Sequence, residues 1–182
     1  LTGSGVVHPH YFRVMTGQKL STILEYQLRE GSYRIIQGNI LTGKQSSSDD
    51  FLSFYENQLT IVPEGNEPQF LGWLLPGLHK LSLSRTFLSW LTPNRSYNLN
   101  TNTNGEERAF VMTGQYDKVL PMNIYPVHLL KAIMAKDIER MEDLGIYEVS
   151  EEDFALCEFV CTSKIDVQRI IKEGLDYIRS EG

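Results

Sequence analysis

Two cysteines, Cys157 and Cys161, are the side chains of this sequence best suited to hold a soft metal ion, and they lie four residues apart in "DFALCEFVCTSK" (153–164). In a helix this spacing places both thiols on one face. Zinc sites need at least three protein ligands, and the nearest further candidates, Glu151 and Asp153, are carboxylates that thiolate-preferring metals disfavour. Since free cysteine is among the most buried residue types, the favoured interpretation is two small buried hydrophobic side chains. A metal site is the alternative.

The histidines are the second group of candidate ligands. His8 and His10 point the same way if they lie on a strand, but a metal site needs a third ligand and none is in view. His79 and His128 have no evident partner in the sequence. The sequence also lacks a P-loop, a GxGxxG motif and the Ser-His-Asp order of a hydrolase. We therefore predict no metal site and no catalytic residue.

The cysteine spacing has a second interpretation, because bacterial ferredoxins hold their clusters with a C-x2-C-x2-C-x3-C-P run. With Cys161 at the fourth position, Cys157 takes the third, and Phe154 and Glu151 take the second and first. We call such a set of four motif positions a frame. Counting back from Pro121 in the same way gives a second frame at Phe110, Thr113, Tyr116 and Leu120. Each frame precedes an amphipathic helix, which indicates an internal repeat. Six of the eight positions hold unsuitable side chains, so no four-thiolate cluster is expected.

A stretch rich in leucine and aromatic residues, "FLGWLLPGLHKLSLSRTFLSWL" (70–91), is the main candidate for binding. It is broken by Pro76 and Gly77 and follows neither a helical nor a strand period. It is either ordinary core or an interface patch. Cations and aromatic rings in such a stretch are typical of surfaces at the level of lipid headgroups or of a docking partner. The side chains suited to bind a ligand there, or to dock a partner, are Trp73, His79, Lys80, Arg85 and Phe87.

The elements that would position these residues fall into three predicted parts, 1–64, 65–108 and 109–182. In the first part we expect a strand over 6–15, followed by a helix that ends at Gly31 as its C-cap. The helix has four apolar residues on one face: Leu20, Ile23, Leu24 and Leu28. Two further strands are expected within 32–43 and 58–63. A Ser- and Asp-rich loop is predicted over 45–50. These elements fit a small β-grasp-like sheet packed against one helix.

The second part is the aromatic and Leu-rich connecting segment, followed by a polar loop with an Asn104-Gly105 turn. The third part is predicted to be helical. One helix of about five turns should run from Pro126 to Gly145. Ser150 and Asp153 resemble a capping box that opens the cysteine helix. The last helix carries apolar residues on one face: Val167, Ile170, Ile171, Leu175 and Ile178. The predicted fold class is thus α+β.

Composition and charge narrow the class of protein further. The sequence has 41% hydrophobic and 22% charged residues, close to globular averages. Residues 136–182 hold 13 acidic and 6 basic side chains, so nucleic acid is not expected as a partner. The low cysteine count indicates a reducing compartment, and no apolar run is long enough to span a membrane. The first residues lack an initiator Met and a signal-peptide pattern, so we expect a piece of a longer protein.

Four stretches, in order, carry a family resemblance: "QFLGWLLPGLHKLSLSRTFLS", "NTNTNGEERA", "GQYDKVLPMNIYP" and "EEDFALCEFVCTSK". They resemble the C-terminal part of the A subunit of the sodium-translocating NADH:quinone oxidoreductase. That family is related to the C subunit of the Rnf electron-transport complex, which keeps both ferredoxin motifs. The first part, around "GSGVVHPHYFRVMTGQKLSTIL", resembles the soluble-ligand-binding β-grasp module. The resemblance implies a β-grasp unit followed by an α-helical ferredoxin-like unit that lacks clusters.

The resemblance also implies a peripheral subunit on the cytoplasmic face of the bacterial inner membrane. Such a complex passes electrons from NADH through FAD, an iron-sulfur centre and covalent FMN to a quinone, and exports sodium. The A subunit carries none of these redox groups and is connected with quinone binding. We therefore expect no cofactor bound by this chain, quinone as its ligand, and the other subunits of the complex, especially the membrane subunits, as partners. A purely structural docking module with no ligand is the alternative.

Overall fold

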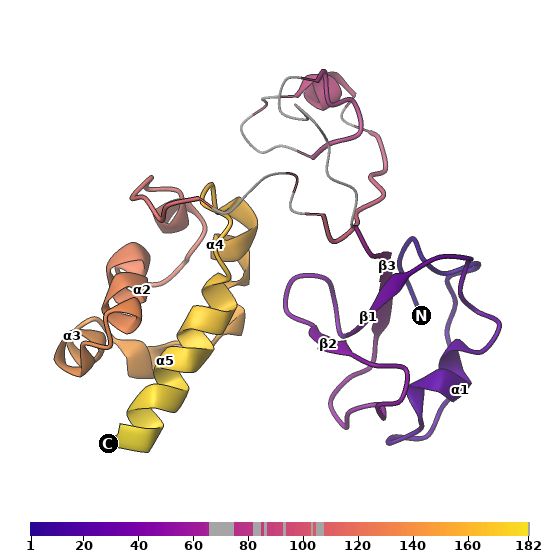
Figure 1. Ribbon diagram of the computed structural model, residues 1–182, viewed down its shortest axis with the longest axis horizontal. Coiled ribbons are helices and arrows are strands. Elements are labelled where there is room, and N and C mark those ends of the chain that lie inside the picture. Colours follow the sequence, from indigo (N-terminus) through magenta and orange to yellow (C-terminus); the bar gives the residue numbers. More distant parts are fainter. Residues whose placement is uncertain are drawn as a thin grey trace. The chain divides into compact units, whose positions relative to one another are not determined.

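The computed structural model describes residues 1–65, 75–81, 85, 87–92, 94–102, 104 and 108–181. The chain divides into two compact units, Leu1–Gly105 and Glu106–Gly182, each with its own core. Figure 1 shows the strands in the first unit and the longer helices in the second. The predicted α+β class is confirmed, whereas the division into 1–64, 65–108 and 109–182 stays a prediction.

The first unit contains a three-stranded antiparallel sheet in the order β2-β1-β3 (Figure 1). The strands are β1 (Tyr33–Gln37), β2 (Lys44–Ser46) and β3 (Leu59–Pro63). The strands predicted within 32–43 and 58–63 are therefore confirmed. The prediction of a loop over 45–50 is wrong at its start, because β2 reaches Ser46. A three-residue polar edge strand has no apolar alternation by which a sequence pattern reveals it.

A short helix, α1 (Leu20–Leu24), packs its apolar face into the core of this unit. The core consists of Val6, Leu20, Ile23, Leu24, Leu59 and Ile61. The N-terminal segment lies along β3, where Thr2 donates to the Leu59 carbonyl at 2.9 Å and accepts from Ile61 at 2.9 Å. Gly3 (φ +107°) permits this approach, since a Cβ there would lie 2.0 Å from the Ile61 carbonyl oxygen.

Two predictions for this unit are wrong. No strand runs over 6–15: Val6 forms an isolated bridge with Leu28, and Pro9 has no N–H to donate to a ladder. The helix predicted to reach Gly31 ends at Leu24, since the chain turns through Tyr26 at φ +60°. Leu28 therefore contacts the core from its isolated bridge with Val6 instead of from the helix.

The second unit is helical. It contains α2 (Pro126–Met134), α3 (Ile138–Asp143), α4 (Ala155–Val160) and α5 (Val167–Glu181). A short 3-10 turn, η2 (Tyr116–Lys118), precedes α2, and two more, η3 (Ile146–Glu148) and η4 (Glu152–Phe154), lie between α3 and α4. The predicted last helix is confirmed as α5, which buries Val167, Ile170, Ile171 and Ile178.

The single five-turn helix predicted from Pro126 to Gly145 is wrong, because the chain breaks between α2 and α3. Lys136 adopts a left-handed conformation at φ +55°. Its N–H donates to Ile133 at 2.9 Å, and the N–H of Asp137 donates to Ala132 at 3.1 Å, which together form a Schellman motif. Asp137 then caps α3 by accepting from the Arg140 N–H at 3.2 Å. A lysine in place of the usual glycine hides this helix end in the sequence.

The start of the cysteine helix agrees with the predicted capping box. The Asp153 carboxylate accepts from the Ser150 N–H at 2.8 Å and from the Ser150 hydroxyl at 2.9 Å. The first turn is the 3-10 segment η4, and α4 continues from Ala155. This interaction fixes the start of the turn that carries Phe154, whose side chain is fully buried.

Helices α2 and α5 pack closely where Gly174 faces Ile133. A Cβ on Gly174 would lie 2.9 Å from three side-chain carbon atoms of Ile133. Gly174 is buried although its helix has charged residues on its exposed face. The small residue thus sets the separation of the two longest helices in the described part of this unit.

Replacing Gly174 with Val should lower the free energy of unfolding by about 1–3 kcal/mol, because the added methyl groups overpack the contact with Ile133. Urea denaturation followed by far-UV circular dichroism measures this. The matched control is Lys172→Val, which places the same side chain on the exposed face of the same helix and should change stability by less than about 0.5 kcal/mol. Equal losses in both variants would show that the close contact does not limit the packing.

Candidate functional site

The cysteines lie in and beside the core of the second unit. Cys157 in α4 is fully buried, and Cys161, which follows the last residue of α4, is partly buried against the same core. Both thiols are free. The hydroxyl of Tyr116 donates to the sulfur of Cys161 at 2.9 Å. The thiols therefore contact an aromatic and aliphatic interior, as predicted for buried hydrophobic side chains.

Burial also sets the electrostatics of this interior. It raises the pKa of Cys157 from its ordinary value of 9.0 to about 11, and the carboxylate of Asp117 and the thiol of Cys161 add to the shift. Burial likewise raises the pKa of Tyr116, with the hydrogen bond to Cys161 as the next cause. Both groups are therefore harder to deprotonate than exposed groups of the same kind, which makes Cys157 a poor nucleophile near pH 7.

The two ferredoxin-like frames converge on this interior. Besides Cys157, five of the eight frame positions lie in the core or pack against it: Phe110, Tyr116, Leu120, Phe154 and Cys161. Tyr116 stands at the third position of the first frame and Cys161 at the fourth position of the second, so their hydrogen bond joins the two frames. Large side chains fill the space that the frame positions surround.

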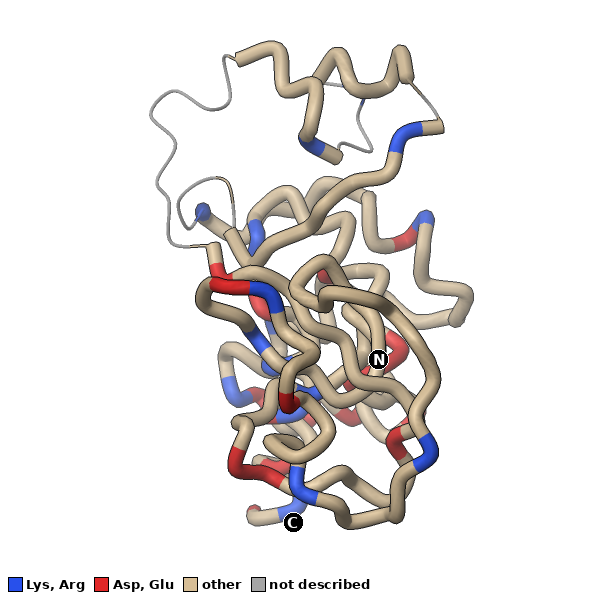
Figure 2. Tube along the Cα trace, turned by 90° about the vertical axis from the view of Figure 1, so that its right-hand side faces the viewer, with Lys and Arg blue, Asp and Glu red and all other residues tan. Residues whose placement is uncertain are grey.

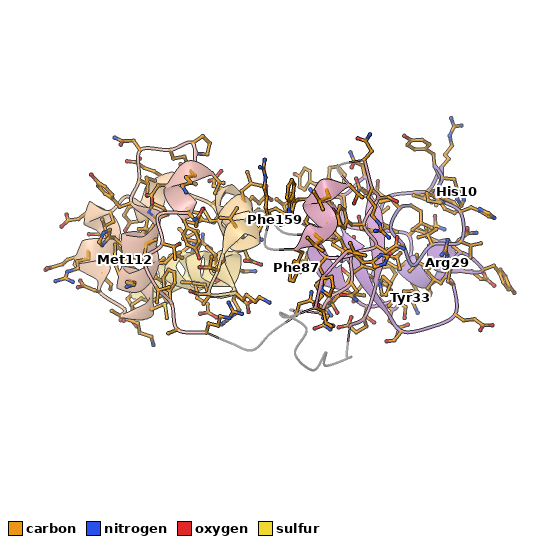
Figure 3. All side chains as sticks on the ribbon, turned by 90° about the horizontal axis from the view of Figure 1, so that it is seen from above. His10, Arg29, Tyr33, Phe87, Met112 and Phe159 are labelled. Atoms are coloured by element: carbon orange, nitrogen blue, oxygen red, sulfur yellow. The ribbon has the colours of Figure 1, made fainter. Side chains whose placement is uncertain are left out.

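The histidines that were weighed as candidate ligands lie on the surface. His8 and His10 are exposed, and Nδ1 of His10 lies 2.6 Å from the carbonyl oxygen of His8. Figure 3 shows His10 at the edge of the first unit. Within the described residues, no group of three or more His, Cys, Asp or Glu side chains is placed to hold a metal ion.

The aromatic and Leu-rich segment leaves the sheet at the end of β3 and returns to the same place. The Gly65 N–H donates to the Thr101 hydroxyl at 2.8 Å, and the Thr101 N–H donates to the Pro63 carbonyl at 3.2 Å. Glu64 pairs with Arg34 of β1, which fixes the start of the segment to the sheet. We call residues 65–101 the excursion, because both ends are fastened to the first unit.

Inside the excursion, residues 75–81 lie against residues 87–92. The Leu88 N–H donates to the Pro76 carbonyl at 3.0 Å, and the buried Ser89 hydroxyl donates to the Lys80 carbonyl at 2.6 Å. Gly77 (φ +60°) faces the ring of Phe87, where a Cβ would lie 2.3 Å from a ring carbon. The turn η1 (Leu88–Leu91) follows. These contacts hold residues 75–81 and 87–92 against each other, although their sequence follows neither a helical nor a strand period.

The structure brings four of the five predicted binding residues into this folded part. Lys80 places its ammonium 5.4 Å from the centre of the Phe87 ring, and Arg85 places its guanidinium 5.9 Å from that of Trp90, both within the range of cation–π attraction. His79 is exposed and lies close to Arg95. Figure 3 labels Phe87 among these side chains. Trp73 lies outside the described residues.

Arg95 is the residue that sequence analysis missed. Its guanidinium donates to Nδ1 of His79 at 2.8 Å and to the carbonyl of Leu78 at 3.1 Å. Because arginine is always protonated, the imidazole must accept this hydrogen bond in its neutral form. A separation of sixteen residues across an irregular turn gives no periodic signal, so only the folded chain reveals this pair.

A hollow lies in the helical unit, between α2 and α3. It has a volume of about 570 Å³ and is lined by polar and charged side chains, among them Tyr125, His128, Lys131, Asp137 and Arg140. Arg140 and Asp137 form an ion pair at 3.2 Å, and Tyr125 meets His128 edge to face. Sequence analysis noted His128 only as a lone histidine. The side chains lining the hollow are largely exposed, and their charges nearly cancel.

None of the helices in the described part of the chain combines the length and the apolar character that crossing a membrane requires.

Comparison with known proteins agrees with these features. A profile of the family described as "NQRA C-terminal domain" matches residues 1–48. Over its whole length the chain is 39% identical to the A subunit of the Na(+)-translocating NADH-quinone reductase of Hahella chejuensis and 39% identical to that of Vibrio anguillarum. It is 38% identical to the corresponding protein of Pasteurella multocida.

In each case the chain spans about two fifths of the relative's length, since it covers 41% of each of them. The similarity extends across both units, because the alignments include the entire chain. The chain therefore belongs to the A-subunit family of the Na(+)-translocating NADH-quinone reductase and corresponds to the C-terminal part of that protein.

Proposed function

We propose that this chain is part of a peripheral subunit of a sodium-translocating NADH-quinone reductase, and that its excursion contributes to quinone binding and to assembly of the complex. The names of the relatives support the membership in such a complex. The observation that carries the quinone proposal is the grouping of His79, Lys80, Arg85 and Phe87 in one folded excursion.

A quinone site needs an apolar slot with a few polar groups that orient the carbonyl oxygens. The excursion offers the rings of Phe87 and Trp90 for stacking and donors on Lys80, Arg85 and Arg95. Trp73 completes the proposed set. These groups bind and orient the ring, whereas electron transfer belongs to FAD, FMN and an iron-sulfur centre that we assign to partner subunits.

We further propose that the helical unit is a ferredoxin-like scaffold without clusters. In two-cluster ferredoxins the fourth cysteine of one motif serves the cluster of the other motif. The Tyr116–Cys161 hydrogen bond joins positions of the two frames, which supports this origin. Each frame also precedes one of the two longest helices of the described part of this unit, α2 and α5, which pack together at Gly174. For the first unit we keep the β-grasp module as the proposed fold.

The location follows from these proposals. A quinone reductase works at a membrane, and its membrane subunits are the partners we propose for the excursion. We place the chain on the cytoplasmic face, because its thiols are free and suited to a reducing compartment.

A structural docking module without a ligand is the second candidate. The observation that favours it is the exposure of large apolar side chains on the excursion, such as Leu91, which is 58% exposed. Under this alternative, substitutions in the excursion weaken assembly of the complex and leave the affinity for quinone unchanged.

Replacing His79 with Ala in the intact complex should raise the KM for quinone several-fold with little change in kcat, because it removes a group that positions Arg95 beside the proposed ring site. Steady-state quinone reduction measures both constants. His128→Ala, an exposed histidine of the other unit, is the control and should change neither. A photoreactive quinone analogue should label this chain in the parent complex. Labelling confined to the membrane subunits, with an unchanged KM, would contradict the quinone proposal.

The buried thiol of Cys157 gives a pH-dependent test of the cluster-free core. Its pKa of about 11 in the folded chain exceeds the ordinary value of 9.0. Since the folded state holds the proton more tightly, the stabilisation is complete below about pH 9 and is lost as the pH rises to about 11. Urea titrations across this range should show a steeper loss of stability for the parent chain than for Cys157→Ala. A thiolate bound to a metal would instead titrate well below 9, and equal slopes would also contradict this account.

A further inference from the structure

The excursion differs in charge from the rest of the chain. From residue 68 to its end, the excursion contains Lys80, Arg85 and Arg95 but no Asp or Glu, although the whole chain carries a net charge of −6. The described part of this stretch shows Lys and Arg colours without Asp or Glu colours in Figure 2. The excursion as a whole (65–101) also contains Glu67, so its basic side chains outnumber its acidic one by three to one. An excess of fixed positive charge attracts an anionic surface.

The same residues expose an apolar surface. Its six large side chains are each between 45% and 58% exposed: Leu75, Leu78, Leu81, Leu88, Trp90 and Leu91. The hydrogen bonds from Leu88 to Pro76 and from Ser89 to Lys80 hold residues 75–81 beside residues 87–92. Such a group of exposed apolar side chains in a short segment indicates an interaction surface.

The cations and the apolar side chains are combined in one place. Arg85 stacks over the ring of Trp90, which is half exposed, and Lys80 lies over Phe87. Tryptophan and long basic side chains are enriched where a protein meets lipid headgroups, since their apolar parts reach the acyl boundary and their polar ends stay in the headgroup layer.

We infer that the excursion binds directly to the surface of an anionic phospholipid bilayer. The leucines and Trp90 enter the boundary between headgroups and acyl chains, and the three basic side chains face the lipid phosphates. The inference rests on the docking role proposed above and deepens it by naming the bilayer as the docked surface. It requires neither bound quinone nor a partner subunit.

Vesicle co-sedimentation of the whole chain, without quinone and without other subunits, tests this inference. We expect binding to vesicles of phosphatidylcholine with phosphatidylglycerol, with a blue shift of tryptophan fluorescence, and much weaker binding to phosphatidylcholine alone. Binding should weaken with added salt, because screening reduces the attraction. Arg85→Gln should lower the partition constant about fivefold, the factor that corresponds to ~1 kcal/mol for a basic residue at an anionic surface.

Leu91→Ser should reduce binding several-fold without removing a charge. The matched controls lie elsewhere in the first unit: Arg13→Gln removes an exposed positive charge, and Ile40→Ser removes an apolar side chain that is 47% exposed. Both should bind as the parent chain does, and thermal unfolding confirms that all four variants fold.

Absence of binding to anionic vesicles by the folded parent chain would overturn the inference, as would equal effects in the control variants. Binding only to isolated membrane subunits would also overturn it and would identify a protein partner. A failed quinone proposal would leave the vesicle result unchanged.

Discussion

The helical unit depends on side-chain packing around Phe154, because its helices are too short to be stable alone. Helix α4 has six residues and α3 has six, well below the length at which isolated helices form in water. Burial of Phe154, Met141, Ile146 and Cys157 supplies the stabilisation that backbone hydrogen bonds do not. Both cysteines pack in or against this core, Cys157 within it and Cys161 at its edge.

This constraint determines where function can reside. Burial moves the pKa of Tyr116 and of Cys157 further above physiological pH, so both side chains are uncharged in this interior. Side chains that can contact other molecules lie on the surface. The excursion combines exposed leucines and Trp90 with basic side chains. Its two ends are fastened at Gly65 and Thr101, so the exit and return points of a long irregular segment stay fixed on the sheet. The cluster-free scaffold and the contact role of the excursion that we propose would together suit a subunit that acts through its neighbours in a complex.

The parts of this fold that were predictable from sequence are those with long periodic patterns. Helix α5 follows from its apolar face, and β1 and β3 follow from their β-branched residues. The break after α2 was not predictable, because Lys136 adopts the left-handed conformation at the helix end. Glycine usually occupies this position and marks the end of a helix in the sequence. The site was predictable as a segment, from the crowding of Leu and aromatic residues near Lys80 and Arg85. The partnership of His79 with Arg95 was not, because it arises from an irregular turn whose geometry depends on Gly77 and the buried Ser89.

The central claim is that a scaffold related to cluster-binding ferredoxins is stabilised here by side chains alone. The most direct test is the content of iron and acid-labile sulfide in protein purified without oxygen, measured by elemental analysis and by a colorimetric sulfide assay. The account predicts only background amounts of both per chain, with Cys157 and Cys161 recovered as free thiols after unfolding. Stoichiometric iron and sulfide, released together with the loss of folded structure, would contradict it.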